Sequence, residues 1–372
     1  MPIQEHWMPR LWCAVASILL ASLCVISPAH AMSMDELRHQ VEAASRIHPP
    51  WDGPRTGAPG QRDKKIALLC EDLRNGGILG VAQGVGEAAA VLQWQVKIFD
   101  ARGTPTGRDK AAAAALAENP DGLIVIGADA EAIRQRLLTF QTRGIPVVGW
   151  HVGPKAGPLP GTPVAMNVST DPLNVARITA AATVIASAGR AGVVIFTDSN
   201  FAIATAKANA MAEVIRACKE CALLEVRDLA ISNSAGQMPA VTRELLERYG
   251  TRWTHALAIN DIYFDYATPA LIASNVGTDR LKFLSAGDGS PAAFMRIATG
   301  TYQTATVAEP LSLHGWQLVD EVNRLLAQQP VSGYIAPVHL VTPDNVGFDG
   351  GPQYRFDPGN DYRASYRRIW QR

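Results

Sequence analysis

Short apolar segments alternate with longer, alanine-rich segments along the chain from residue 64 onward. The apolar segments have the length and composition of buried strands, and the segments between them have the apolar spacing of helices. We expect strands at residues 66–70, 95–99, 122–126, 146–150, 191–197, 223–226, 255–259, 281–285 and 304–307. We expect helices near residues 79–92, 108–118, 130–143, 172–187, 204–218, 238–249, 263–274, 291–299 and 313–328.

Strands that are apolar throughout and alternate with helices are typical of parallel sheets covered on both faces. There are too many such units here for one compact open sheet, so the pattern predicts an α/β fold with two doubly wound parallel-sheet lobes. Sheets of this kind bind ligands at the carboxyl ends of their strands. The side chains that follow each strand are therefore the first candidates for a binding site.

Two aromatic side chains stand together at one of these strand ends, where Trp150 is followed by His151. His151 has three readings: a hydrogen bond to a ligand, a structural role, or a base oriented by Asp129 or Asp288. Trp150 is either a core residue or a platform for a ring-shaped ligand. The sequence favours a ligand contact for His151 and leaves the two readings of Trp150 equal.

Other strand ends carry amide and carboxylate groups. Asn260 can donate and accept hydrogen bonds at once, which suits hydroxyl and amide ligands, whereas the next residue, Asp261, is the better helix cap. Asp288 and Glu309 offer carboxylate acceptors at two further strand ends. The remaining candidate is the loop Arg74-Asn75-Gly76-Gly77, which either reaches a ligand or forms an exposed turn.

Motifs for cofactor and metal chemistry are missing from the sequence. A loose G-x-G-x-x-A pattern occurs at residues 84–89, but it lies inside an expected helix rather than at a strand-to-helix turn, so close helix packing explains it better than a dinucleotide. We expect no cofactor and no metal site. The chain has 34 basic and 34 acidic side chains and no net charge, so it lacks the excess of positive charge that is typical of nucleic-acid-binding proteins.

The N-terminal residues resemble a secretory signal peptide. Arg10 precedes an apolar, uncharged stretch at residues 11–27, and the sequence Pro28-Ala29-His30-Ala31 offers a small-x-small cleavage site. A membrane anchor is the alternative, but the apolar stretch is slightly short for a span of about 20 residues. We expect cleavage after Ala31 and a mature protein located outside the cytoplasm, which the family resemblance described below specifies as the periplasm.

Cleavage there would leave three cysteines, of which Cys218 and Cys221 form a C-x-x-C pair. The pair has three readings: a redox site, half of a zinc site, or a local disulfide. It follows a helix instead of opening one, so a dipole-activated redox thiol is disfavoured. An oxidising compartment favours the disulfide.

Several segments together resemble the type I periplasmic solute-binding proteins that serve ABC importers, in their ribose/galactose/autoinducer-2 branch. They are IALLCEDLRNGG at 66–77, PDGLIVI at 120–126, GIPVV at 144–148, AIND at 258–261, GDGSP at 287–291 and VAEP at 307–310. The resemblance implies two lobes joined by a three-segment hinge, with crossings near Val168, Glu309 and Val338. The residues themselves indicate a signal peptide (1–31) and an N-terminal helix with a Pro/Gly-rich strap (32–62). The resemblance divides the rest of the chain into an N-terminal lobe (63–167 plus 310–338), a C-terminal lobe (168–309 plus 339–344) and a C-terminal extension (345–372).

The resemblance also implies which residues contact a ligand. These are Arg74, Asn75 and Ile78 in the first loop, together with Asn260, Asp288 and Glu309; the residues themselves add Asp129, Trp150, His151 and Phe201. Sugar binders of this branch often carry Asp-Arg where this chain has Trp150-His151, and an Arg on a helix where the nearest match is Thr205. This chain therefore lacks the arginine and aspartate side chains that form paired hydrogen bonds to sugar hydroxyl groups. We therefore expect a less polar or ring-containing ligand rather than ribose.

The function expected from these features is capture of a small, sugar-like molecule without catalysis, followed by delivery to an ABC permease. A sensor that docks on a chemoreceptor or histidine-kinase ectodomain is the first alternative. A secreted hydrolase or lyase that uses His151 is the second. We expect a monomer.

Overall fold

The computed structural model describes residue 1, residues 33–46 and residues 50–371. The predicted signal peptide, apart from Met1, and its cleavage site lie outside the described residues. Among the described residues, no helix is both long and apolar enough to cross a membrane.

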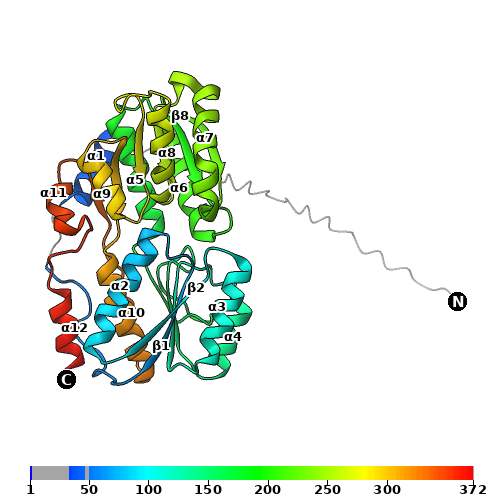
Figure 1. The fold of residues 1–372 in the computed structure, drawn as a ribbon, viewed down its shortest axis with the longest axis vertical. Helices are drawn as coiled ribbons and strands as arrows, with labels where there is room; N and C mark the ends of the chain where they lie inside the picture. The colour runs from blue at the N-terminus through cyan, green and yellow to red at the C-terminus, as the bar shows by residue number, and fades with distance from the viewer. Residues whose placement is uncertain (2–32, 47–49, 372) are drawn as a thin grey trace. The chain divides into compact units, whose positions relative to one another are not determined.

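The first sheet has the strand order β2-β1-β3-β4-β6-β5, and only β5 runs antiparallel to its neighbour. Its strands are β1 (Lys65–Cys70), β2 (Gln95–Asp100), β3 (Gly122–Ile126), β4 (Val147–Trp150), β5 (Gly157–Pro158) and β6 (Met166–Val168). Helices α2 (Gly76–Val91) and α10 (Leu311–Leu326) cover one face, and α3 (Pro105–Ala117) and α4 (Arg134–Thr142) cover the other (Figure 1).

The alternation of side chains along β1 explains this layering. Ile66, Leu68 and Cys70 are buried in the cluster that includes α2 and α10, whereas Ala67 and Leu69 belong to the cluster with α3 and α4. Successive side chains of a strand point to opposite faces, so a strand covered on both sides must be apolar at every position. The continuous apolar sequence of β1 is thus a direct consequence of its central place.

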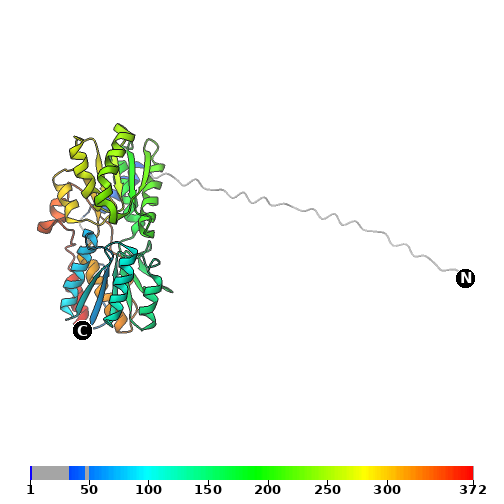
Figure 2. The same ribbon diagram turned by 45° about the vertical axis from the view of Figure 1, so that its right-hand side comes forward.

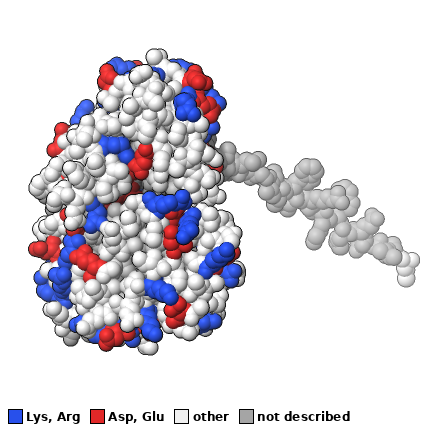
Figure 3. Space-filling model, viewed as in Figure 1, with Lys and Arg blue, Asp and Glu red and all other residues white. Residues whose placement is uncertain are grey.

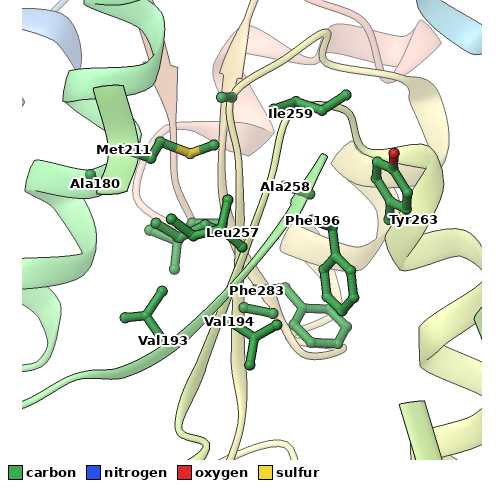
Figure 4. Close-up of a cluster of buried hydrophobic side chains, with 14 of the residues drawn as sticks. Ala180, Val193, Val194, Phe196, Met211, Leu257, Ala258, Ile259, Tyr263 and Phe283 are labelled. Atoms are coloured by element: carbon green, nitrogen blue, oxygen red, sulfur yellow. The ribbon is translucent and has the colours of Figure 1, made fainter. Parts of the chain in front are cut away.

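The second sheet has the order β12-β11-β10-β9-β7-β8, with β12 antiparallel to β11. Its strands are β7 (Gly192–Thr197), β8 (Ala222–Asp228), β9 (His255–Ala258), β10 (Lys282–Ser285), β11 (Gln303–Ala308) and β12 (His339–Val341). The helices of this lobe are α5 (Pro172–Ala186), α6 (Ala202–Ala217), α7 (Ser234–Tyr249), α8 (Ile262–Ala273) and α9 (Pro291–Ala298), with the 3-10 turns η1 (Ile231–Asn233) and η2 (Gly250–Arg252). In its core, Phe196, Tyr263 and Phe283 lie on one side of the sheet, and Ala180 and Met211 lie on the other (Figure 4).

The chain passes between the two lobes three times in its central part. It leaves the first sheet after β6, returns after β11 to form α10, and enters the second sheet again as β12. The two-lobed α/β fold with a three-segment hinge, predicted from the sequence, is confirmed. The three strands that the sequence did not predict, β5, β6 and β12, are two or three residues long, too short to give a periodic signal.

Close contact between α2 and α10 depends on two glycines. A Cβ atom on Gly84 would lie 2.9 Å from the Cα atom of Ser312, and one on Gly315 would lie 2.4 Å from the backbone of Gly84. The glycines at residues 84 and 86 therefore belong to a helix, as expected, and the first of them serves helix packing.

The segments before β1 and after β12 each contact both lobes. Helix α1 (Met34–Ala44) packs on α5, whereas Trp51 lies in the core cluster of the first lobe. After α11 (Val346–Asp349) and the 3-10 turn η3 (Gly351–Gln353), Phe356 packs in a cluster with α9, and α12 (Tyr362–Trp370) packs on α10 (Figure 2).

On the face drawn in Figure 3, basic and acidic side chains are interspersed among the described residues.

The cysteines of the described residues are in two states. Cys218 and Cys221 are joined by a disulfide directly after α6, with their Cα atoms 5.3 Å apart, and Cys70 is a buried free thiol.

Candidate functional site

A cavity lies where the carboxyl ends of the strands of the two sheets face each other. The first lobe contributes Asp72, Asn75, Ile78, Gly127, Trp150 and His151 to its wall; the second contributes Phe201, Ile203, Ala204, Lys207, Ile231, Ile259, Asn260 and Asp288. The space between these atoms is about 590 Å³, part of it open to solvent.

His151 and Trp150 are held in one fixed arrangement. His151 has a positive φ of 53°, and its ring stacks on the Trp150 indole with 3.7 Å between centroids and 10° between planes. The Trp150 Nε1 group donates a hydrogen bond to Nδ1 of His314 on α10, at 3.1 Å. Trp150 is 1% exposed, so the indole serves as a backing for His151 as well as part of the cavity wall.

Four ionisable side chains meet at the floor of the cavity, next to the second crossing. His151 Nε2 lies 2.8 Å from Glu309 Oε1, and Lys207 Nζ lies 4.0 Å from the same oxygen. His151 Nδ1 lies 4.0 Å from Asp288 Oδ1. Lys207 also donates to the Ala286 carbonyl at 2.8 Å. The cluster therefore sets two cationic or protonatable groups against two carboxyl groups.

The two carboxyl groups of this cluster have opposite pKa shifts. Burial by itself would raise the pKa of Glu309, but the charge and hydrogen bond of His151 and the charge of Lys207 outweigh it and lower the pKa. Burial dominates at Asp288 and raises its pKa, although His151 and Lys207 act in the opposite direction. Glu309 is thus the fixed anion of the floor, and Asp288 is the group whose charge depends more on what fills the cavity.

Neighbouring loops fix the orientation of Asp288. Asn260 Nδ2 donates to Asp288 Oδ2 at 2.7 Å, and Asn260 Oδ1 accepts from the Ile262 backbone at 3.0 Å. Asp261 occupies the N-cap position of α8, as expected, but its side chain makes no capping hydrogen bond. Its carboxylate accepts from the backbone of Gly289 at 2.8 Å and of Ser290 at 3.2 Å, and so holds the loop that carries Asp288.

A periplasmic binding protein domain model matches residues 66–330 of the chain. The chain belongs to the periplasmic binding protein family. A comparison with curated proteins finds no match.

Solved structures of ABC transporter solute-binding proteins share this fold. One from Agrobacterium vitis with bound allitol is 20% identical, has a TM-score of 0.66, and the match covers 77% of this chain and 97% of that one. One from Bacillus halodurans with bound myo-inositol is 17% identical, with a TM-score of 0.65 and coverage of 77% and 96%. The 5-methylthioribose transporter solute-binding protein from Thermotoga lettingae is 15% identical, with a TM-score of 0.67 and coverage of 77% and 89%.

The cavity of this periplasmic binding protein brings together seven of the ten residues predicted from the sequence. These are Asn75, Ile78, Trp150, His151, Phe201, Asn260 and Asp288. Asn75 also caps α2, because its Oδ1 accepts from the Gly77 backbone at 2.9 Å. Its Nδ2 group donates to no other side chain or backbone among the described residues.

The other three predicted residues do not line the cavity. Arg74 turns outward, with its side chain 62% exposed and paired with Asp72 at 2.6 Å. Glu309 lies behind His151, out of reach of a ligand. Asp129 accepts from the Glu131 backbone at 2.9 Å and, across the cavity, from the Ala202 backbone at the start of α6, at 3.1 Å.

Lys207 is the main wall residue that sequence reasoning missed. It is 3% exposed and lies on α6, two residues after Thr205. Thr205 is the nearest match to the family arginine, but it is exposed. A signal was present, because Lys207 is the one charged residue in the otherwise uncharged stretch at 202–212. Asp72, which lies within the segment 66–77 that carries the resemblance, and Ile231 of η1 were also missed.

His151, Asp288 and Glu309 form the group of described residues whose donor atoms could hold a metal ion, since these atoms lie within 4.8 Å of one another. The ammonium of Lys207 already lies 4.0 Å from Glu309, and His151 bonds to the same carboxylate. With the carboxylate already engaged by protein groups, the arrangement fits a salt-bridged floor better than a cation site.

Proposed function

We propose that this protein captures a small, neutral, sugar-like molecule in the cavity between its lobes and delivers it to an ABC importer. The observation that carries the proposal is a cavity whose polar groups come from both lobes, with His151 and Asn75 facing Asn260, Asp288 and Lys207. A ligand held by both walls stabilises the closed arrangement of the lobes. It is bound and released without chemical change.

The charge balance of the floor supports a neutral ligand. Lys207 lies 4.0 Å from Glu309, and His151 contacts Glu309 and faces Asp288, so the floor already pairs its basic and acidic groups and offers a charged ligand no unpaired partner. The free oxygen of Asp288 can accept from a hydroxyl, and the amides of Asn75 and Asn260 can donate to one. The bound allitol, myo-inositol and 5-methylthioribose of the structural neighbours support a polyhydroxylated ligand.

Contacts across the cavity support closure of the lobes on the ligand. Helix α6 has no side-chain cap of its own, and Asp129 of the opposite lobe accepts from its first backbone N–H group. Arg108 of α3 lies over the Phe201 ring, with its guanidinium carbon 5.5 Å from the ring centroid, while it pairs with Glu71 at 2.7 Å. Both contacts need the two lobes to be close together.

Secretion and delivery complete the proposal. The signal sequence at residues 1–31 would place the protein in the periplasm, where a monomer with its lobes closed would dock on the membrane permease of the importer. A receptor ectodomain is the alternative partner, and the binding step is the same for both.

A thermal-shift screen of the purified protein against sugars, polyols, cyclic polyols and nucleosides tests the binding step. A ligand at a hundred times its Kd adds about 2.7 kcal/mol to the free energy of unfolding, a shift of several degrees. We expect a polyhydroxylated compound to give this shift in the wild type and in the exposed control Asp279→Ala, and Asp288→Ala to abolish it. A ligand whose shift persists in Asp288→Ala binds elsewhere and contradicts the proposed site.

Delivery is tested in cells. A strain that carries Asp288→Ala should lose uptake of the compound found in the screen, and the Asp279→Ala strain should retain it. Unchanged uptake in the first strain would argue for the sensor alternative.

A further inference from the structure

Four isoleucines line the cavity in addition to its polar floor. Ile203 at the start of α6, Ile231 of η1 and Ile259 after β9 come from the second lobe, and Ile78 of α2 comes from the first. We call these four residues the isoleucine wall. Ala204 and the Phe201 ring adjoin it.

We infer that the ligand carries an apolar substituent, such as a short alkyl or alkylthio group, which packs on the isoleucine wall while its hydroxyl groups bind at the floor. The inference rests on the proposed function, because it names the chemical class of ligand for the same cavity.

Polar and apolar side chains both line the cavity. The floor residues Lys207, Asp288 and Asn260 are all buried and lie beside the second crossing at Glu309. Ile78, Ile203 and Ile259 of the isoleucine wall are buried as well, whereas Phe201 and Ile231 are partly buried. A ligand that fits both regions therefore has a polar end and an apolar end.

The isoleucine wall offers no partner for a hydroxyl group. A hydroxyl placed against it loses its hydrogen bonds to water and gains none in return, which weakens binding. Each methylene group placed there leaves water and strengthens binding about fourfold. Aromatic rings can stack on the C–H face of a sugar, but Ile78, Ile203, Ile231 and Ile259 have no flat face to offer.

The side-chain acceptors of the first lobe near the wall are already engaged. Asp72 is bound by the Arg74 guanidinium at 2.6 Å, and the oxygen of Asn75 is bound by the backbone of its own helix. The first lobe therefore presents few free acceptors to hydroxyl groups on this side of the cavity. A fully hydroxylated ligand could satisfy its groups at the floor but not along the isoleucine wall.

Matched pairs of probes test the inference with the full protein. The pairs are methyl and n-butyl β-D-galactopyranoside, methyl and n-butyl β-D-ribofuranoside, and 5-S-methyl and 5-S-butyl 5-thio-D-ribose, with Kd measured by calorimetry. A butyl group has three more methylene groups than a methyl group. In the pair whose sugar fits the cavity, we therefore expect the butyl compound to bind about 50-fold tighter than the methyl compound. Equal or weaker binding of the butyl member in every pair that binds would overturn the inference.

Variants locate the effect on the wall. Ile231→Asn should bring the ratio of the two Kd values close to one, and Ile231→Ala gives a milder reduction should the asparagine variant fail to fold. The matched control is Ile272→Asn, at an exposed isoleucine of α8 that is 58% accessible, and it should keep the full ratio. A ratio that Ile231→Ala and Ile231→Asn both leave unchanged would also overturn the inference. Binding of none of the six probes would instead count against the proposed function, and the inference would fall with it.

Discussion

Removing the Lys207 ammonium tests whether the floor of the cavity is a balanced charge cluster. The Nζ atom lies 4.0 Å from Glu309 Oε1 and donates to the Ala286 carbonyl at 2.8 Å. Lys207→Met keeps most of the volume of the side chain but removes its positive charge. The Glu309 carboxylate, which is 1% exposed, then has one fewer positive group to balance its negative charge.

The expected loss of stability follows from the distance and the burial. Two unit charges 4.0 Å apart attract by about 4 kcal/mol at an effective dielectric constant of 20. Removing one partner of a buried ion pair typically costs about 3–5 kcal/mol, because the other charge remains buried. We therefore expect Lys207→Met to lower the free energy of unfolding by about 3–5 kcal/mol.

Urea unfolding of a double-mutant cycle measures the effect. In Lys207→Met/Glu309→Gln both charges are gone, so the double variant should lose at least about 2 kcal/mol less than the sum of the two single variants. Thr205→Ala, at an exposed position of the same helix, is the control and should stay within about 0.5 kcal/mol of the wild type. Additive losses, or a loss below about 1 kcal/mol in Lys207→Met, would refute the reasoning.

Three further predictions concern other contacts. Asp129→Asn removes the charge that faces the start of α6 across the cavity, so ligand affinity should fall about two- to fivefold in calorimetry; unchanged affinity would contradict a role in closure. Burial lowers the pKa of His314 from 6.5 to about 4, so the folded protein binds fewer protons than the unfolded chain between these values and loses up to about 3 kcal/mol as the pH falls through this window. His314→Gln should flatten that part of the stability curve, and an unaltered curve would count against a buried neutral imidazole. Reduction of the Cys218–Cys221 disulfide should cost about 2 kcal/mol, because the closed loop is short, and should leave ligand affinity unchanged.

The long elements of the fold could be predicted because each buries a continuous or periodic apolar surface. All nine strands expected from residue 66 onward are present, and their ends lie within two residues of the expected ones. Strands β6 and β12 could not be predicted, since three residues carry no period of their own. They form because the chain that crosses between the lobes passes the edge of a sheet.

The candidate site could be predicted where a polar residue directly follows a strand. His151, Asn260 and Asp288 were found in this way, because the fold places strand ends around the ligand. Lys207 lies on a helix, several residues past the strand end, where position along the chain gives no such indication. The separate roles of Glu309 and Asp129 depend on residues far away in sequence, Lys207 and Ala202, and only the folded chain brings them together.

Hydrogen exchange of the full protein, with and without the compound that gives the largest thermal shift, tests most directly whether the ligand binds between the lobes. The account predicts slower exchange in both walls at once, in residues 74–79 of the first lobe and in residues 201–208 and 259–263 of the second. Protection confined to one lobe, or to segments away from the cavity such as residues 351–362, would contradict it.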